Sequence, residues 1–256
     1  MTSQPDTITI PIIGASIAGL TTAHSLLSHF TTTNNTTTNK GKGTKIKILL
    51  INPHPSFYWA IAAPRILTKP PAFTESQYLI PIADGFAKYS PDVFEFILGR
   101  ATSLDFDKKL LNVEEVTTDT ESTKKTTMRE IKYDYLVIAS GSTPSASSTE
   151  PLFPGEDGKN GEIYPFKLSP TSSTTITEAI KSAQTAISTA KRITVIGAGP
   201  IGVEIAGELG DLITPSSSSS SSEGEDKKEI TLISSTPRIL PTLKPSASET
   251  ATSLLT

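Results

Sequence analysis

Two glycine-rich segments carry the clearest chemical signal in the sequence. The first contains Gly14, Ala15, Ser16, Ile17, Ala18 and Gly19, and the second contains Gly197, Gly199, Pro200, Ile201 and Gly202. Each follows a short apolar run and precedes apolar residues at helical spacing, which predicts a strand, a tight turn and a helix. In such a unit the first glycine permits the turn, the small middle residue lets a pyrophosphate approach, and the last glycine lets the helix pack on the strand. The helix N-terminus then offers N–H groups and partial positive charge to the phosphates.

The two segments differ in how well they match the dinucleotide-binding pattern. The second has glycine at all three positions, whereas the first has Ser16 at the middle position. Serine is small enough for a phosphate to approach, so we interpret both segments as dinucleotide-binding turns. The alternative is that the glycines only close a helix against a strand. Two such units in one chain favour nucleotide binding.

The residue that ends the next strand usually contacts a ribose hydroxyl, about 20 residues beyond the turn. Asn52 and Ser234 take this place, and each lies farther along because a polar segment intervenes, residues 31–44 and 214–227 respectively. Neither residue is the usual acid. In the second unit, the absence of an acid at Ser234 removes repulsion of a 2′-phosphate, and Arg238 can pair with such a phosphate. We therefore hypothesise that NADPH is tolerated or preferred, the alternative being a solvated surface arginine.

Hydrophobic patterning predicts an α/β fold with parallel sheets. The order strand, helix, strand occurs twice, at 8–13, 17–30 and 45–51 and again at 192–196, about 200–212 and 229–234. Further expectations are a helix broken near Pro81 within 75–89, a strand at 93–100, hairpins at 103–116 and around 117–127, a strand at 130–139 and a helix at 174–190. The two polar segments, 31–44 and 214–227, are predicted to be disordered loops.

Composition narrows the function further. These 256 residues contain no cysteine, which excludes a redox-active cysteine pair and cysteine-ligated metals within them. The three histidines lack metal-site spacing, so we expect no metal. With a net charge of −3 and no basic stripe, nucleic acid is not expected as a partner. No apolar run reaches the roughly 18 residues of a membrane span. We expect a cytoplasmic protein without a signal or transit peptide, and the sequence leaves peripheral membrane association open.

Taken in order, these segments resemble the two-dinucleotide flavoprotein oxidoreductases. The segment 133–142 resembles the strand ending in Ala-Thr-Gly that returns to the flavin, with Ser140 and Gly141 at its end. The second turn followed by Glu204 resembles the NAD(P)H site. A narrower resemblance, to the apoptosis-inducing-factor-like proteins of the ferroptosis-suppressor type and their fungal relatives, rests on residues 56–65 and 231–235 and on the missing cysteines. It implies that Arg65 touches FAD and that the backbone of Ala101 contacts the adenine.

The resemblance also implies a domain plan and a reaction. We expect a Rossmann-like FAD-binding domain with a β-hairpin insertion at residues 6–168, followed by the start of a Rossmann-like NAD(P)H-binding domain at 169–256. The chain looks truncated at its C-terminus by comparison with this family. The expected function is an FAD-dependent oxidoreductase that takes a hydride from NADH or NADPH and passes electrons to an acceptor such as a quinone. A catalytically inactive nucleotide-binding fragment and an FAD-dependent monooxygenase are the alternatives. No side chain stands out as a catalytic acid, base or nucleophile, and the oligomeric state is open.

Overall fold

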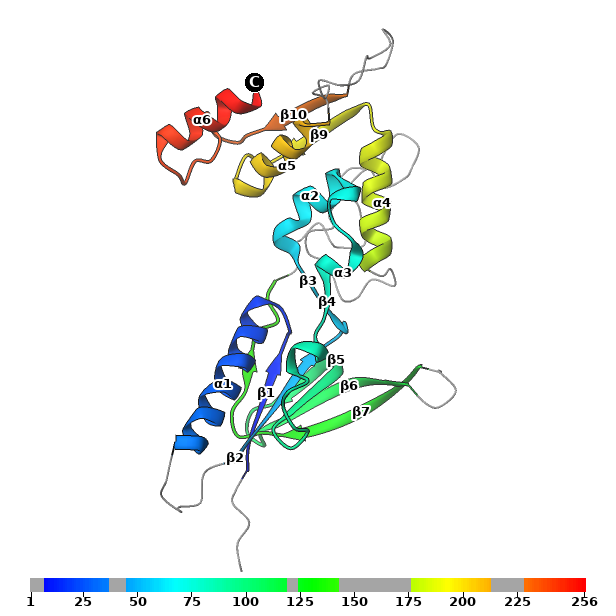
Figure 1. Cartoon of the computed structure of the whole chain (residues 1–256), viewed down its shortest axis with the longest axis vertical. Coiled ribbons are helices and arrows are strands. Elements are labelled where there is room, and N and C mark those ends of the chain that lie inside the picture. The colour runs from blue at the N-terminus through cyan, green and yellow to red at the C-terminus, as the bar shows by residue number, and fades with distance from the viewer. Residues whose placement is uncertain (1–6, 37–44, 119–123, 143–175, 213–227) are drawn as a thin grey trace, which may run out of the picture. The chain divides into compact units, whose positions relative to one another are not determined.

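A computed structural model describes residues 7–36, 45–118, 124–142, 176–212 and 228–256 of the chain (Figure 1). Its residues form two compact units. The first unit consists of Met1–Tyr58 and Leu79–Ser142, and the second consists of Trp59–Tyr78 and Thr143–Thr256. The chain therefore leaves the first unit after Tyr58 and returns to it at Leu79. The predicted domain boundary at 168 and 169 lies outside the described residues and stays a prediction.

The first unit is built on a six-stranded sheet with the order β7-β6-β5-β2-β1-β8. Its parallel part is formed by β1 (Thr7–Ile13), β2 (Lys45–Asn52), β8 (Val137–Ile138) and the beginning of β5 (Phe94–Asp105). The rest of β5 continues into an antiparallel meander with β6 (Leu110–Thr118) and β7 (Lys124–Lys132). This sheet confirms the predicted α/β class, and the meander corresponds to the predicted hairpin insertion.

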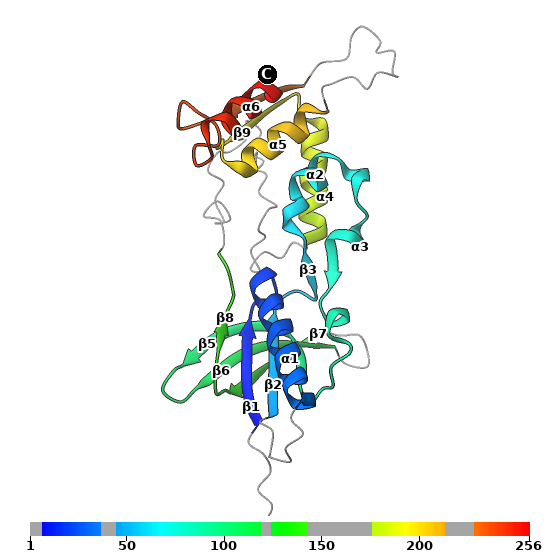
Figure 2. The same cartoon turned by 60° about the vertical axis from the view of Figure 1, so that its left-hand side comes forward.

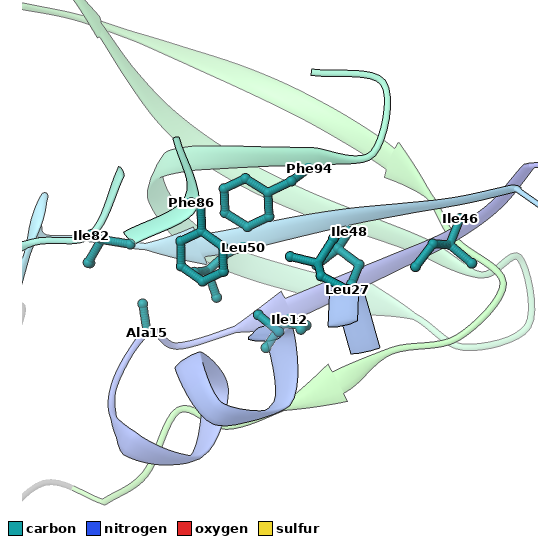
Figure 3. Close-up of a cluster of buried hydrophobic side chains, with 10 residues drawn as sticks. Ile12, Ala15, Leu27, Ile46, Ile48, Leu50, Ile82, Phe86 and Phe94 are labelled. Atoms are coloured by element: carbon teal, nitrogen blue, oxygen red, sulfur yellow. The ribbon is translucent and has the colours of Figure 1, made fainter. Parts of the chain in front are cut away.

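Both faces of the parallel strands are buried, which explains why these strands read as continuous apolar runs. Successive side chains of a strand point to opposite faces. Ile48 and Leu50 pack with Leu27 of α1 (Ile17–Thr36) in one cluster, part of which Figure 3 shows. On the other face, Leu49 and Ile51 pack with side chains of the meander, Ile97, Leu111, Val113, Ile131 and Tyr133. The first unit therefore has a core on each side of its sheet.

The second unit has a much smaller sheet. Its strands, β9 (Arg192–Ile196) and β10 (Glu229–Ile233), form a parallel pair. The helices are α4 (Ile176–Thr189), α5 (Pro200–Gly210) and α6 (Pro245–Leu255), together with the segment 59–78. That segment contains η1 (Ala60–Ala62), α2 (Ala63–Thr68), η2 (Pro70–Ala72) and α3 (Glu75–Tyr78), and α2 packs against both α4 and α5 (Figure 2).

Polar contacts fasten the helices of the second unit. Gln184 on α4 donates a hydrogen bond from Nε2 to the carbonyl of Ile66 on α2, at 2.7 Å. The ammonium of Lys228 donates to the carbonyls of Ile187, Ser188 and Ala190 at 3.1, 2.7 and 2.6 Å. These carbonyls end α4 and have no further helical turn to accept from, so the lysine satisfies acceptors that would otherwise depend on water.

Several predicted boundaries are wrong. Helix α1 runs to Thr36, six residues into the segment predicted as a loop, because extending an existing helix costs far less than starting one. The expected helix at 75–89 is instead α3, a short strand β4 (Leu79–Pro81) and η3 (Ala83–Phe86). Strand β4 forms because it pairs with β3 (Ser56–Tyr58), a partner that is distant in sequence. The remainder of both polar segments lies outside the described residues.

The prediction of a single strand at 130–139 is also wrong. The segment contains the end of β7 and all of β8, which lie at opposite ends of the sheet. β7 ends at Lys132, and β8 begins at Val137 beside β1. Between them the chain crosses to β1, where Asp134 donates its N–H to the carbonyl of Thr9 at 3.0 Å and accepts the Thr9 N–H at 2.8 Å. The hairpin tip expected at 117–127 is shorter, because β6 continues to Thr118 and β7 starts at Lys124.

Candidate nucleotide-binding sites

The first glycine-rich turn, Gly14–Gly19, joins β1 to α1 as predicted. Gly14 has a φ of 100°, and its N–H donates to the carbonyl of Ile51 at the end of β2, at 2.8 Å. A Cβ at Gly19 would lie only 1.8 Å from the carbonyl oxygen of Gly14. The first glycine therefore sets the turn, and the last permits the close approach of helix to turn that the sequence pattern requires.

Three parallel strands end beside this turn, so their last residues share one edge of the sheet. Asn52, at the end of β2, accepts the Ala15 N–H at Oδ1 (3.0 Å) and donates from Nδ2 to the carbonyl of His54 (2.8 Å). A Cβ at Gly14 would lie 2.4 Å from the carbonyl oxygen of Ala139, so the segment leading to Ser140 lies against the turn. Gly141 has a φ of 71°. The structure thus brings Ala15, Asn52 and the segment before Ser140 together.

The second glycine-rich turn, Gly197–Gly202, repeats this geometry between β9 and α5. Gly197 has a φ of 107° and donates its N–H to the carbonyl of Ile233 at the end of β10, at 2.9 Å. A Cβ at Gly202 would again lie 1.8 Å from the carbonyl oxygen of the first glycine. Pro200 occupies the first turn of α5, where a missing N–H costs nothing. Ile201 follows it with an exposed side chain.

Space in front of the second turn suits a bound phosphate. Apart from its chain neighbours, a Cβ built at Gly197 or Gly199 would meet no atom of the described residues within 4 Å. The N-terminus of α5 begins directly after Gly199, so its unpaired N–H groups face this region. Both turns therefore have the glycine geometry of a diphosphate site, and the second also has open space before it among the described residues. Among the residues that the structure describes, no group of three His, Cys, Asp or Glu side chains could hold a metal ion.

Comparison with known proteins decides the family. Residues 8–256 match the pyridine nucleotide-disulphide oxidoreductase family. The chain belongs to this family. It is 37% identical over 244 residues to the oxidoreductase ptaL of Pestalotiopsis fici, covering 94% of this chain and 53% of the relative. It is 33% identical over 245 residues to the oxidoreductase phnG of Penicillium herquei, covering 95% of this chain and 51% of that relative. The chain thus spans about half the length of these curated relatives.

Solved structures support the same fold. The water-forming NADH oxidase of Lactobacillus brevis, bound to NADH, has a TM-score of 0.59 and 17% identity to this chain, covering 96% of this chain and 44% of the oxidase. The family match confirms the predicted family of pyridine nucleotide-dependent oxidoreductases. Because the chain spans about half of its curated relatives, its own activity is a proposal. The disulphide chemistry in the family name has no counterpart in these 256 residues, because they contain no cysteine.

Two further residues predicted from the resemblance lie away from the turn motifs. Ala101 is half-buried on β5, at the point where the register between β5 and β6 shifts. It lies three residues after Leu98, the residue of β5 that pairs with Asn52. Arg65 lies on α2 in the second unit. Their predicted contacts with FAD stay predictions.

Arg65 belongs to a charged cluster between α2 and α5. Its Nε and Nη2 donate to Oε1 of Glu208 at 2.9 and 2.7 Å. Lys69 pairs with Oε2 of Glu208 at 2.9 Å and with Asp211 at 2.6 Å. Burial raises the pKa of Glu208, but hydrogen bonds from Arg65 and Lys69 outweigh this effect and leave the pKa lowered. Each carboxylate oxygen of Glu208 is therefore ion-paired, Oε1 with Arg65 and Oε2 with Lys69.

Glu204, predicted as part of the NAD(P)H site, lies one turn before Glu208 on α5 and is exposed. No hydrogen bond or ion pair engages its carboxylate among the residues that the structure describes. Glu208 and Lys69 are not among the residues predicted from the sequence. The signal was present, because Glu204 and Glu208 are spaced to share one face of a helix.

His54 was also missed. It lies two residues beyond Asn52, at the strand edge that carries the first turn. Its Nε2 is buried without a hydrogen-bond partner among the described residues. Burial, and then the positive charge of Arg100, lower the pKa of His54. Both effects disfavour the charged imidazole, and the structure shows no partner for its Nε2 within the described residues. Its place directly after a strand-ending Asn-Pro was the available signal.

The loop after β10 carries hydroxyls and positive charge. Thr236 donates its N–H to Oγ of Ser234 at 3.2 Å and its hydroxyl to the carbonyl of Arg238 at 2.8 Å. Nη2 of Arg238 donates to the carbonyls of Pro241 and Leu243 at 2.7 and 3.2 Å. The N–H of Leu240 donates to the carbonyl of Ala198, which fastens the loop to the second turn. No acidic residue occurs between Ser234 and Ser248.

Proposed function

We propose that the chain provides the FAD site and part of the NAD(P)H site of an oxidoreductase that passes electrons from NAD(P)H through flavin to an acceptor such as a quinone. The observation that carries this proposal is the repeated geometry of the two turns. In each, the first glycine bonds to the end of the next strand, and the last glycine lies against the first. Two such turns supply two places for a diphosphate in one chain.

The residues of the first turn have separate tasks. The N-terminus of α1 supplies N–H groups to the pyrophosphate of FAD, and Gly14 and Gly19 keep the backbone close enough to reach it. Asn52 holds the N–H of Ala15, which fixes the orientation of the turn. Ser140 and Gly141 lie on the segment that passes the turn. When bound, FAD supplies the hydride-accepting ring, and the protein contributes binding, orientation and exclusion of water.

The acceptor and the branch of the family rest on resemblance. The apoptosis-inducing-factor-like proteins are the branch that we propose, with Arg65 and the backbone of Ala101 as further FAD contacts. A quinone is the acceptor that this branch suggests. The acceptor is tested by the flavin experiment below, because reoxidation of the flavin can be followed with and without an added acceptor.

The second turn is proposed to prefer NADPH over NADH. Ser234, Thr236 and Arg238 lie on a loop without acidic residues that is fastened to this turn. The carbonyls of Pro241 and Leu243 fix one nitrogen of the guanidinium, which orders the remaining N–H groups before a 2′-phosphate binds. Arg238→Ala should therefore lower the NADPH/NADH affinity ratio about tenfold. An unchanged ratio would refute the preference.

The overall proposal is tested with the purified chain. We expect a flavin spectrum that bleaches on anaerobic addition of NADPH and recovers when menadione is added. A protein that binds no flavin after incubation with FAD would instead support a catalytically inactive fragment. A flavin that is reduced but reoxidised only by O₂, with consumption of an aromatic co-substrate, would support the monooxygenase.

A further inference from the structure

The loop that follows β10 presents a threonine to solvent directly before a proline. Thr236 and Pro237 are both exposed. Within the described residues, 234–239 make no backbone-to-backbone hydrogen bond, and the next such bond along the chain runs from the N–H of Leu240 to the carbonyl of Ala198, at 2.8 Å. The segment is therefore held between the end of β10 and Leu240 by side-chain contacts.

The contacts of Thr236 are all with its neighbours in the chain. Its hydroxyl donates to the carbonyl of Arg238 at 2.8 Å, and its N–H donates to Oγ of Ser234 at 3.2 Å. Oγ of Ser234 also lies 3.3 Å from the Thr236 hydroxyl oxygen. Exposed hydrogen bonds of this kind contribute little net stability, because water replaces them when they open. An enzyme that binds the loop in extended form therefore has little to break, and proline already disfavours helical backbone at the residue before it.

Another exposed pair, Ser90 and Pro91, provides a comparison within the same chain. These are the two Ser-Pro or Thr-Pro pairs in the part of the chain that the structure describes. The carbonyl of Ser90 accepts the N–H groups of Val93 and Phe94, each at 3.0 Å, and Phe94 is a core residue that begins β5. Extending the chain at Ser90 would break these backbone bonds, and Thr236 has no such bonds to lose.

We propose that Thr236 is a phosphorylation site for a proline-directed protein kinase, and that its phosphate switches off recognition of the 2′-phosphate of NADPH. The hydroxyl oxygen attacks the γ-phosphorus of ATP, the bond from this phosphorus to the ADP oxygen breaks, and the hydroxyl proton passes to a base of the kinase. ADP leaves, and nothing is oxidised or reduced. The modification site rests on the loop, whereas the switch rests on the NADPH preference in the proposed function.

The switch follows from what the phosphate replaces and what it meets. It removes the proton that Thr236 donates to the carbonyl of Arg238, and it adds about −1.5 to −2 charge with three acceptor oxygens. The carbonyls of Pro241 and Leu243 hold one nitrogen of the Arg238 guanidinium. Its remaining N–H groups are the donors that a phosphate on the same loop engages. An incoming 2′-phosphate then meets a like charge and an occupied arginine.

The modification is tested on the purified full chain with ATP and a mitogen-activated protein kinase that phosphorylates myelin basic protein in the same assay. Mass spectrometry should locate phosphate on Thr236, and Thr236→Val and Pro237→Ala should lose it. Ser90→Ala, at the other exposed pair, is the matched control and should keep the phosphate on Thr236. Phosphate on Ser90 but not on Thr236 would overturn the proposal, as would a chain that accepts no phosphate on Thr236.

The switch is tested with two probes that differ only in the 2′-phosphate, adenosine 2′,5′-bisphosphate and 5′-AMP. Their affinities are measured by calorimetry with saturating FAD present. Phosphorylation should weaken the bisphosphate about tenfold and change 5′-AMP by less than about twofold. Kinase treatment of Thr236→Val should alter neither affinity. Unchanged affinity for the bisphosphate after phosphorylation of Thr236 would refute the switch.

The same two probes distinguish failure of the switch from failure of the proposed function. A chain that binds the bisphosphate no more tightly than 5′-AMP before kinase treatment refutes the NADPH preference, and the switch falls with it. In that chain, phosphate on Thr236 still confirms the modification site, and its absence refutes the site as well.

Discussion

In the first unit Gly14 donates its N–H to Ile51, and in the second Gly197 donates its N–H to Ile233, at 2.8 and 2.9 Å. The φ angles of the two glycines differ by only a few degrees, 100° against 107°. Yet the surroundings differ. A Cβ at Gly14 would strike Ala139, whereas a Cβ at Gly197 would meet no atom of the described residues within 4 Å, its chain neighbours aside. The local turn is the same, but within the described part of the chain the first is enclosed by the segment after β8 and the second is open.

The same contrast extends to the strands. Residues Ile48, Leu50 and Ile51 of β2 are almost completely buried, whereas Ile196 of β9 and Ile233 of β10 are 69% and 47% exposed. The same turn geometry therefore forms beside a buried strand and beside a more exposed one. Polar contacts such as those of Lys228 and Glu208 fasten the helices of the second unit.

The largest effect on the free energy of unfolding is expected from a matched pair of substitutions, one in each turn. Gly14→Ala should lower the free energy of unfolding by about 3 kcal/mol or more, because positive φ and a clash with Ala139 act together. Gly197→Ala meets positive φ alone and should cost about 1–2 kcal/mol. Hydrogen exchange of peptides spanning β1–β2 and β9–β10 measures each unit separately. Equal losses in the two units would show that enclosure of the turn is energetically unimportant.

The second largest effect tests the polar contacts of the second unit. Lys228→Met removes an ammonium from three carbonyls at the end of α4 and should destabilise that unit by about 1.5–3 kcal/mol. The first unit should keep its exchange protection. Lys244→Met, at an exposed position of the second unit, is the matched control and should stay within about 0.5 kcal/mol. Similar losses for the two variants would remove the special role of Lys228.

These two predictions also show what the sequence could and could not reveal. Both turns were predictable because the strand, the glycines and the helix are neighbours in the chain. The pairing of Arg65 with Glu208 was not, because 143 positions separate them. Likewise, the pattern at 130–139 predicts a single strand, and only the pairing of β8 with β1 separates its second half from β7. Asn52 was predicted from its place at a strand end, but its hydrogen bond to Ala15 required the folded turn.

A smaller effect compares the residues that end the two strands. Asn52→Ala loses the bonds to Ala15 and His54 and should cost about 1 kcal/mol of stability in the first unit. It should also weaken FAD binding about tenfold, because the turn is no longer held. Ser234→Ala, at the corresponding place, loses only weak contacts of 3.2 and 3.3 Å and should change stability by less than about 0.5 kcal/mol. Flavin release and hydrogen exchange measure the two consequences. A Ser234→Ala loss as large as that of Asn52→Ala would contradict the difference.

The smallest expected effect concerns pH, and it compares one carboxylate from each unit. The pKa of Glu95 is lowered chiefly by hydrogen bonding from Arg129. Burial raises the pKa of Glu208, but hydrogen bonds from Arg65 and Lys69 lower it below its ordinary value. A pKa below the ordinary value of 4.5 means that each ionised group stabilises the folded state fully above pH 4.5. This stability is lost as the pH falls through the lower folded-state pKa.

Glu208→Gln should therefore reduce the fall in the free energy of unfolding between pH 4.5 and lower pH. Urea unfolding followed by the fluorescence of Trp59, which lies in the second unit, measures this free energy. Glu95→Gln should leave the Trp59 signal unchanged. It should instead reduce the loss of hydrogen-exchange protection in β2 and β5 at acidic pH. Above pH 4.5 each variant should be less stable than the unmodified chain by a constant amount. If both variants altered the Trp59 signal alike, the two units would not unfold separately, and the comparison between them would have to be replaced by a single cooperative transition.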